Sequence, residues 1–144
     1  MTYWASAPKY AVIAVVIGGA GLLAWRALAP HQQAETVHAF VSPELSPQAV
    51  SGKRAFDDVC VACHGENALG TDQGPPLVHD IYNPGHHSDE AFFVAAKLGV
   101  RQHHWPYGNM PPQPDVTPDE VADIVQYVRE LQVANGITAR PRTM

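Results

Sequence analysis

The chain has 144 residues and a formal net charge of −5, with 9 lysine and arginine residues against 14 aspartate and glutamate residues. So little positive charge makes nucleic-acid binding implausible, because that function needs clustered basic residues. The sequence contains no internal repeat, no phosphate-binding glycine motif and no low-complexity tract. These features indicate one small domain with additional terminal segments.

The first feature along the chain is an apolar segment, Tyr10–Leu28, whose only charged residue is Arg26 near its end. As an α-helix it would extend roughly 28 Å, close to the thickness of the bilayer hydrocarbon. Trp4 and Trp25 are suited to the two membrane interfaces, and Arg26 can extend its charge toward water. We expect a membrane anchor at residues 1–29, with one transmembrane helix at about residues 10–28.

A cleaved secretory signal peptide is the alternative, since its apolar core can be nearly this long. The cleavage signal is poor, because cutting after Ala27-Leu28-Ala29 would leave Pro30 at the new N-terminus. We favour a retained anchor, and both interpretations place the rest of the chain outside the cytoplasm. Beyond residue 30 lie fourteen acidic and seven basic residues, a net charge of −7, so a partner steered by charge should present basic or neutral surface.

Residues 30–46 are polar and contain several prolines, and we expect a linker there. Val37–Val41 is apolar enough to dock on the domain, which would shorten this tether. We place the domain at residues 47–137 and a short tail at residues 138–144.

A helix is predicted from Pro47, with Ser46 as its N-cap and proline at the first helical position. Its apolar face carries, in order, Ala49, Gly52, Phe56 and Val59. This helix leads directly to Cys60, the first residue of the most informative motif in the chain.

Cys60-Val61-Ala62-Cys63-His64 has the CxxCH spacing by which haem is attached to a chain through two thioether bonds. A thioredoxin-like redox site would require a βαβ environment, and structural zinc usually needs a second ligand pair. Neither is evident, although both remain alternatives. Thirteen prolines and eleven glycines, many of them after this motif, would leave long structureless loops unless the loops wrap around a bound group.

Two further helices are predicted. The first begins after Ser88, carries acidic residues in its first turn and stops at Gly99. The second has a capping box formed by Thr117 and Glu120 and ends at Asn135-Gly136. Its apolar residues recur at helical spacing and comprise Val121, Ile124, Val125, Val128 and Leu131.

Met110 is followed by two prolines, which stiffen the backbone that presents its sulfur. With CxxCH and Gly74-Pro75-Pro76-Leu77, this loop resembles the class I c-type cytochromes over about residues 46–136. The resemblance implies a small all-α fold with loops wrapped around one covalent haem c. It also implies that Gly52 and Phe56 meet Tyr127 between the first and last helices.

The resemblance assigns roles to particular residues. Haem would be attached to Cys60 and Cys63, and its iron would be ligated by His64 and Met110. The carbonyl of Pro75 would accept a hydrogen bond from His64, and Leu77 would pack on the haem. Arg101, His103, Trp105 and Tyr107 precede Met110 and are candidate donors to the haem propionates, although packing and surface roles are the alternative.

The resemblance also implies an electron-transfer protein rather than an enzyme, with no small-molecule substrate. We expect a single-pass protein of the bacterial inner membrane, with its haem domain in the periplasm. It would carry single electrons between respiratory or photosynthetic membrane complexes. A fixed haem subunit of a larger oxidoreductase is the alternative, and a haem sensor or peroxidase is less favoured.

Eight histidines raise the question of a second metal, above all His86-His87 and His103-His104. Adjacent residues rarely direct both rings at one ion, and no carboxylate or cysteine cluster completes a ligand set. We expect surface or haem-edge hydrogen bonds from these residues. His103 and His104 are also the alternatives to Met110 as the sixth iron ligand.

Overall fold

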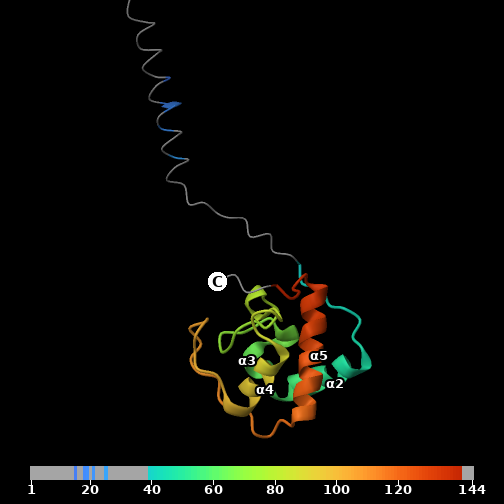
Figure 1. The fold of residues 1–144 in the computed structure, drawn as a ribbon. Coiled ribbons are helices and arrows are strands. Elements are labelled where there is room, and N and C mark those ends of the chain that lie inside the picture. Colours follow the sequence, from blue (N-terminus) through green and yellow to red (C-terminus); the bar gives the residue numbers. More distant parts are fainter. Residues whose placement is uncertain (1–14, 16–17, 20, 22–24, 26–38, 141–144) are drawn as a thin grey trace, which may run out of the picture. The chain divides into compact units, whose positions relative to one another are not determined.

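The computed structural model describes residues 39–140 together with Val15, Gly18, Gly19, Gly21 and Trp25 (Figure 1). The chain divides into two units, Met1–Val37 and His38–Met144. Among the described residues, no helix is both long enough and apolar enough to cross a membrane. Most of the predicted transmembrane helix at residues 10–28, and residues 30–38 of the predicted linker, lie outside the described residues.

The second unit is helical. Its described residues form four α-helices and two short 3₁₀-helices, and they contain no β-strand beyond one isolated bridge between Val100 and Met110. This arrangement agrees with the predicted all-α fold.

Helix α2, Pro47–Val59, begins as predicted. Ser46 is its N-cap and accepts a hydrogen bond from Ala49 N at its side-chain oxygen. Ala49, Gly52 and Phe56 are buried, whereas Val59 is 39% exposed. Val59 is the last residue of α2 and is not fully covered by other parts of the chain, so the expectation that it belongs to the buried face was wrong.

Helix α5, Pro118–Ala134, also has the predicted start. Thr117 and Glu120 form a capping box, each side chain hydrogen-bonding the other residue's backbone. This helix contributes most of the buried side chains, namely Val121, Ile124, Val125, Tyr127, Val128, Leu131 and Gln132. All five of its predicted apolar positions are therefore confirmed as buried.

Helices α2 and α5 pack closely against each other (Figure 1). A Cβ atom at Gly52 would lie 1.9 Å from the backbone oxygen of Asp123, so only glycine permits this approach. Phe56 meets Tyr127 edge to face, with 5.5 Å between ring centroids. The contact implied by the resemblance is present, and it justifies a glycine that costs about 1 kcal/mol within a helix.

Shorter elements lie between these helices. Helix α3, Val61–His64, follows α2 after Cys60, and the 3₁₀-helices η1, Glu66–Ala68, and η2, Asp80–Tyr82, interrupt the long loop that comes next. Helix α4, Asp89–Leu98, begins after Ser88 and stops at Gly99, as predicted. Although α4 is largely apolar, none of its residues is buried.

The end of the predicted linker lies on the domain. Phe40 and Leu45 pack against the core cluster. Asn135 holds Val41 through two hydrogen bonds, accepting from its N–H at 2.8 Å and donating to its carbonyl at 2.9 Å. The docking that the apolar residues suggested therefore occurs, and residues 40–46 add no free length to a tether.

Candidate functional site

The two cysteines lie where α2 gives way to α3. Cys60 is half-buried at the end of α2, Cys63 is exposed, and both thiols are free. The backbone N–H groups of Cys63 and His64 both donate to the carbonyl of Cys60, at 3.2 and 2.9 Å, which winds the motif into one helical turn. Burial, with a further contribution from Cys63, raises the pKa of Cys60 to about 11, so this group is a neutral thiol near pH 7.

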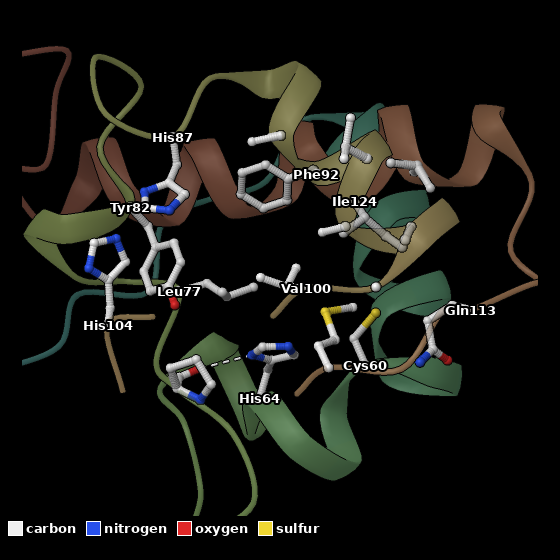
Figure 2. A pocket seen from close by; sticks show the side chains of 18 of the residues that line it. Cys60, His64, Leu77, Tyr82, His87, Phe92, Val100, His104, Gln113 and Ile124 are labelled. Atoms are coloured by element: carbon white, nitrogen blue, oxygen red, sulfur yellow. Dashed lines mark hydrogen bonds between the residues drawn. The ribbon is translucent and has the colours of Figure 1, made fainter. Parts of the chain in front are cut away.

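The orientation of His64 is fixed by a backbone carbonyl. Its Nδ1 lies 2.9 Å from the oxygen of Pro75, and because a carbonyl can only accept, Nδ1 carries the proton (Figure 2). The hydrogen bond implied by the resemblance is therefore present, and the lone pair of Nε2 is left free. Burial lowers the pKa of His64 despite the opposing effect of this hydrogen bond, which favours the neutral imidazole that a metal requires.

Gly74 allows Pro75 to reach His64. A Cβ atom at Gly74 would lie 2.9 Å from the carbonyl oxygen of Cys63, so the loop can pass this close only with glycine at that position. Beyond the turn, Leu77 N donates to the carbonyl of Ala68 at 2.8 Å. The loop is thereby held against the end of the CxxCH turn.

Met110 is positioned by the only β-bridge within the described residues. Val100 and Met110 exchange two backbone hydrogen bonds of 3.0 Å each. The approach depends on Gly99, which has φ +73 and whose Cβ, if present, would lie 2.4 Å from the oxygen of Met110. The sequence suggested a stiff loop from the prolines that follow Met110, but gave no indication of this pairing with Val100.

A cavity of about 600 Å³ brings these groups together. Nine of the ten residues given a role at the haem site in the sequence analysis line it, namely Cys60, His64, Pro75, Leu77, Arg101, His103, Trp105, Tyr107 and Met110. Cys63 is the exception and lies on the exposed side of the same helical turn.

Sequence reasoning missed part of the wall. Tyr82, His87 and Phe92 line the cavity together with Val100 and Ile124 (Figure 2). Phe92 lies in a helix that was predicted, but an apolar run such as Ala91–Ala96 does not reveal which side faces a cofactor. Tyr82 ends the three-residue 3₁₀-helix η2, and no sequence pattern marked it as a cavity residue.

Trp105 places a polar group in the cavity wall. The indole Nε1 of Trp105 is buried and has no hydrogen-bond partner among the residues that the structure describes. Its ring packs edge to face on His79, with 5.1 Å between centroids, which fixes the direction of the N–H group. The Tyr82 hydroxyl lies close enough to Trp105 for the indole to act against the rise in the Tyr82 pKa that burial causes.

Comparison with known families shows to which protein family the chain belongs. The profile described as cytochrome c matches residues 49–132, which is more than half of the chain. The chain belongs to the cytochrome c family. A search of curated proteins found no match.

Cytochrome c domains bind haem c covalently and transfer electrons, and the residues of this cytochrome fit that group. Cys60 and Cys63 have the attachment spacing, and the His64 imidazole and the Met110 thioether both line the mainly apolar cavity. The assignment of His64 and Met110 as the two iron ligands remains a prediction.

Proposed function

We propose that this cytochrome c is a membrane-anchored, single-haem, class I protein that passes single electrons between membrane redox complexes. The proposal rests on one observation: two side chains suited to bind iron line the same apolar cavity. They are His64, whose tautomer is fixed by Pro75, and Met110, whose backbone is held by the bridge to Val100. If His64 and Met110 both held the iron, the bound haem would have no position left for oxygen or peroxide chemistry.

Each group in the cavity has a defined part in this function. Cys60 and Cys63 would hold the macrocycle through thioethers, and His64, oriented by its hydrogen bond to Pro75, would hold the iron through Nε2. Bound there, haem c supplies a one-electron ferric to ferrous couple. The apolar wall excludes water, and a thioether ligand such as Met110 raises the reduction potential. A ligand set that stays the same in both oxidation states keeps reorganisation small.

Ligation by Met110 is tested by the variant Met110→Ala, with Met144→Ala as the matched control. The ferric wild type should show the weak long-wavelength absorption of an iron–sulfur bond. Met110→Ala should lose this band, have a lower potential and bind small ligands, whereas Met144→Ala should behave as the wild type does. A wild-type spectrum in Met110→Ala would refute the assignment and favour His103 or His104.

The anchor and the bacterial inner-membrane location are supported by the apolar segment at residues 10–28. The tether then consists of residues 30–38, because residues 40–46 are held on the domain. Fully extended, such a segment reaches about 30 Å, which confines the haem domain near the membrane at high effective concentration.

The tether is tested by exporting the protein without residues 1–30 behind a cleavable signal. Haem attachment and spectrum should be retained, while electron flux in whole membranes should fall at native expression level. Unchanged flux would refute a role for the tether.

A fixed subunit of a larger oxidoreductase is the second candidate, and the short tether favours it over a far-reaching shuttle. Purification of the native protein in mild detergent distinguishes the two, since a fixed subunit should copurify with other chains in constant proportion. Recovery of the cytochrome alone would support the shuttle.

A further inference from the structure

Histidines from two separate loops converge at one edge of the cavity. His86 and His87 precede α4, and His103 and His104 follow it. One ring nitrogen from each of His86, His87 and His104 can be chosen so that all three lie within 4.8 Å of one another. The sequence argument against a second metal rested on the poor convergence of adjacent residues, but here the third ring comes from the opposite loop.

The distance between two of these nitrogens is that of a metal site. Nε2 of His86 lies 3.3 Å from Nε2 of His104. Ligand nitrogens at the usual Zn–N length in a tetrahedral site are separated by about 3.3 Å. The pair is thus already spaced for a shared ion, although a hydrogen bond between one protonated and one bare nitrogen has a similar length.

His87 is oriented as metal-binding histidines usually are. Its Nδ1 donates to the carbonyl of Ile81 at 2.8 Å, which leaves the lone pair of Nε2 available. In known metal sites the second ring N–H is commonly donated to a backbone carbonyl, which fixes both tautomer and ring direction.

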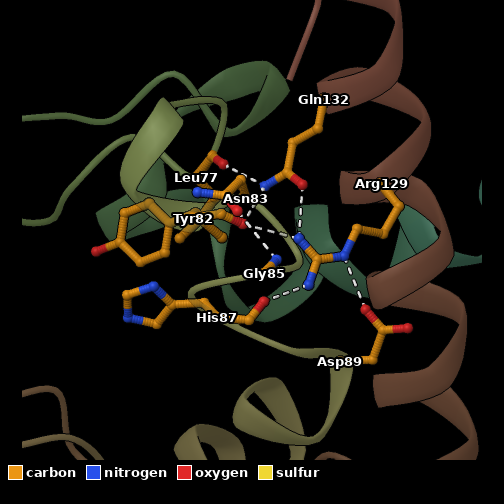
Figure 3. Close-up of polar contacts among 8 residues, drawn as sticks. All are labelled: Leu77, Tyr82, Asn83, Gly85, His87, Asp89, Arg129 and Gln132. Atoms are coloured by element: carbon orange, nitrogen blue, oxygen red, sulfur yellow. Dashed lines mark hydrogen bonds and ion pairs between the residues drawn. The ribbon is translucent and has the colours of Figure 1, made fainter. Parts of the chain in front are cut away.

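The loop that carries His86 and His87 is rigidly supported. Both of their backbone N–H groups donate to the carbonyl of Asn83, at 3.0 and 2.9 Å. Arg129 of α5 then donates to the carbonyl of His87 at 2.6 Å and to that of Tyr82 at 2.8 Å (Figure 3). A scaffold held at this many points positions ligands before an ion arrives, which lowers the cost of binding.

We propose that His86, His87 and His104 bind a late first-row divalent cation of the zinc or copper type. Imidazole nitrogens favour these ions, whereas Mg²⁺ and Ca²⁺ need oxygen ligands that the three-histidine set lacks. A fourth position is open to water or to His103, whose ring centroid lies 4.2 Å from that of His104.

The site has a consequence for the cofactor, and this consequence, unlike metal binding, rests on the proposed function. His87, His103 and His104 also line the cavity that contains His64 and Met110. A dication at this edge favours the addition of an electron nearby, so its binding should raise the reduction potential of the haem.

Isothermal titration of the full-length haem-loaded protein with Zn²⁺ tests the site. The wild type should bind one Zn²⁺ per chain and give no response to Mg²⁺. The double variant His86→Gln, His104→Gln should bind Zn²⁺ at least about 100-fold more weakly. The matched control is His79→Asn, which removes a histidine outside the set while keeping a side-chain acceptor for the N–H of Ile81.

Failure of the wild type to bind Zn²⁺, or equal binding by the double variant, would overturn the proposal and leave the cluster as hydrogen-bonding groups at the cavity edge. Cu²⁺ added to the wild type gives a second measurement that does not depend on the folding of any variant. Its electron paramagnetic resonance spectrum should show hyperfine coupling to imidazole nitrogens, and a spectrum without that coupling would equally refute the site. Both measurements are independent of electron-transfer activity.

Discussion

The contact between α2 and α5 and the wall formed by α4 with residues 99–113 are built in different ways. At the α2–α5 contact, Phe56, Tyr127 and Leu131 are almost completely buried by other parts of the chain. In the cavity wall, α4 is apolar but has no buried residue, and Val94, which lines the cavity, is 47% exposed. The α2–α5 contact is therefore a complete hydrophobic core. The wall formed by α4 and residues 99–113 has apolar side chains that no other part of the chain fully covers.

This difference indicates how stability and function are shared in a small domain. A chain of this size buries too little surface for a large margin of stability, so a covalently held cofactor can supply the missing apolar surface. The α2–α5 contact then serves as the fixed frame, and the cavity wall should gain most of its order from haem. Four changes test this comparison.

Removal of both attachment points should have the largest effect. In the double variant Cys60→Ala, Cys63→Ala, acid-acetone extraction should remove the haem. The variant should also lose most of its free energy of unfolding, which is roughly 5–15 kcal/mol for a typical native domain. Hydrogen exchange should show that protection falls first in α4 and residues 99–113 and persists longest in α2 and α5. Cys63→Ala alone should retain one thioether and an intermediate stability. Uniform loss of protection would contradict the comparison.

The frame itself is broken by Gly52→Ala. The new Cβ would meet the Asp123 backbone at 1.9 Å, so the two helices must separate. Overpacking of this kind costs about 3 kcal/mol, more than the gain of about 1 kcal/mol in helix propensity. Urea unfolding measures the change, and Arg54→Ala, at an exposed position of the same helix, should be close to neutral.

Arg129 connects the frame to the cavity wall. It donates to Asp89, Gln132 and two backbone carbonyls, and its guanidinium lies 5.0 Å from the centre of the Phe92 ring. Lysine cannot reproduce this planar set of donors, so Arg129→Lys should cost about 2 kcal/mol. Arg140→Lys should change stability by less than about 0.5 kcal/mol, because its ion pair with Asp80 is largely exposed. Equal effects of the two variants in urea unfolding would mean that the hydrogen bonds of Arg129 contribute nothing to the free energy of unfolding.

The smallest effect concerns Glu130 of α5, whose carboxylate accepts hydrogen bonds from Ser46 at the start of α2 and whose contribution to stability depends on pH. Desolvation acts to raise the pKa of Glu130, but hydrogen bonds from Ser46 and Gln126 outweigh it and lower the pKa below its ordinary value. A carboxyl group whose pKa is lower in the folded protein than in the unfolded chain stabilises the fold at pH values above about 4.3, its pKa when unfolded. This contribution is lost as the pH falls through the pKa of the folded state.

The stability difference between wild type and Glu130→Gln should therefore shrink as the pH of urea titrations is lowered from neutrality. Solvent screening at this partly exposed site keeps the difference under about 1 kcal/mol. A pH-independent difference would refute the role of the Glu130 carboxylate.

The sequence alone determined the parts of this protein that depend on neighbouring residues. Helix starts at Ser46 and Thr117 were readable because a cap and its partner lie within three positions of each other. CxxCH was readable because both thiols and the imidazole lie within one turn. The proline carbonyl at position 75 was expected only through family resemblance, since nothing local directs it toward His64.

Contacts between distant segments were decided by the tertiary structure. The Val100–Met110 bridge, the docking of Val41 on Asn135 and the approach of His86 to His104 each join residues that no local pattern pairs. Such contacts follow from how the finished α2–α5 frame positions the loops, and local propensity, which acts over a few residues, contains no information about that arrangement.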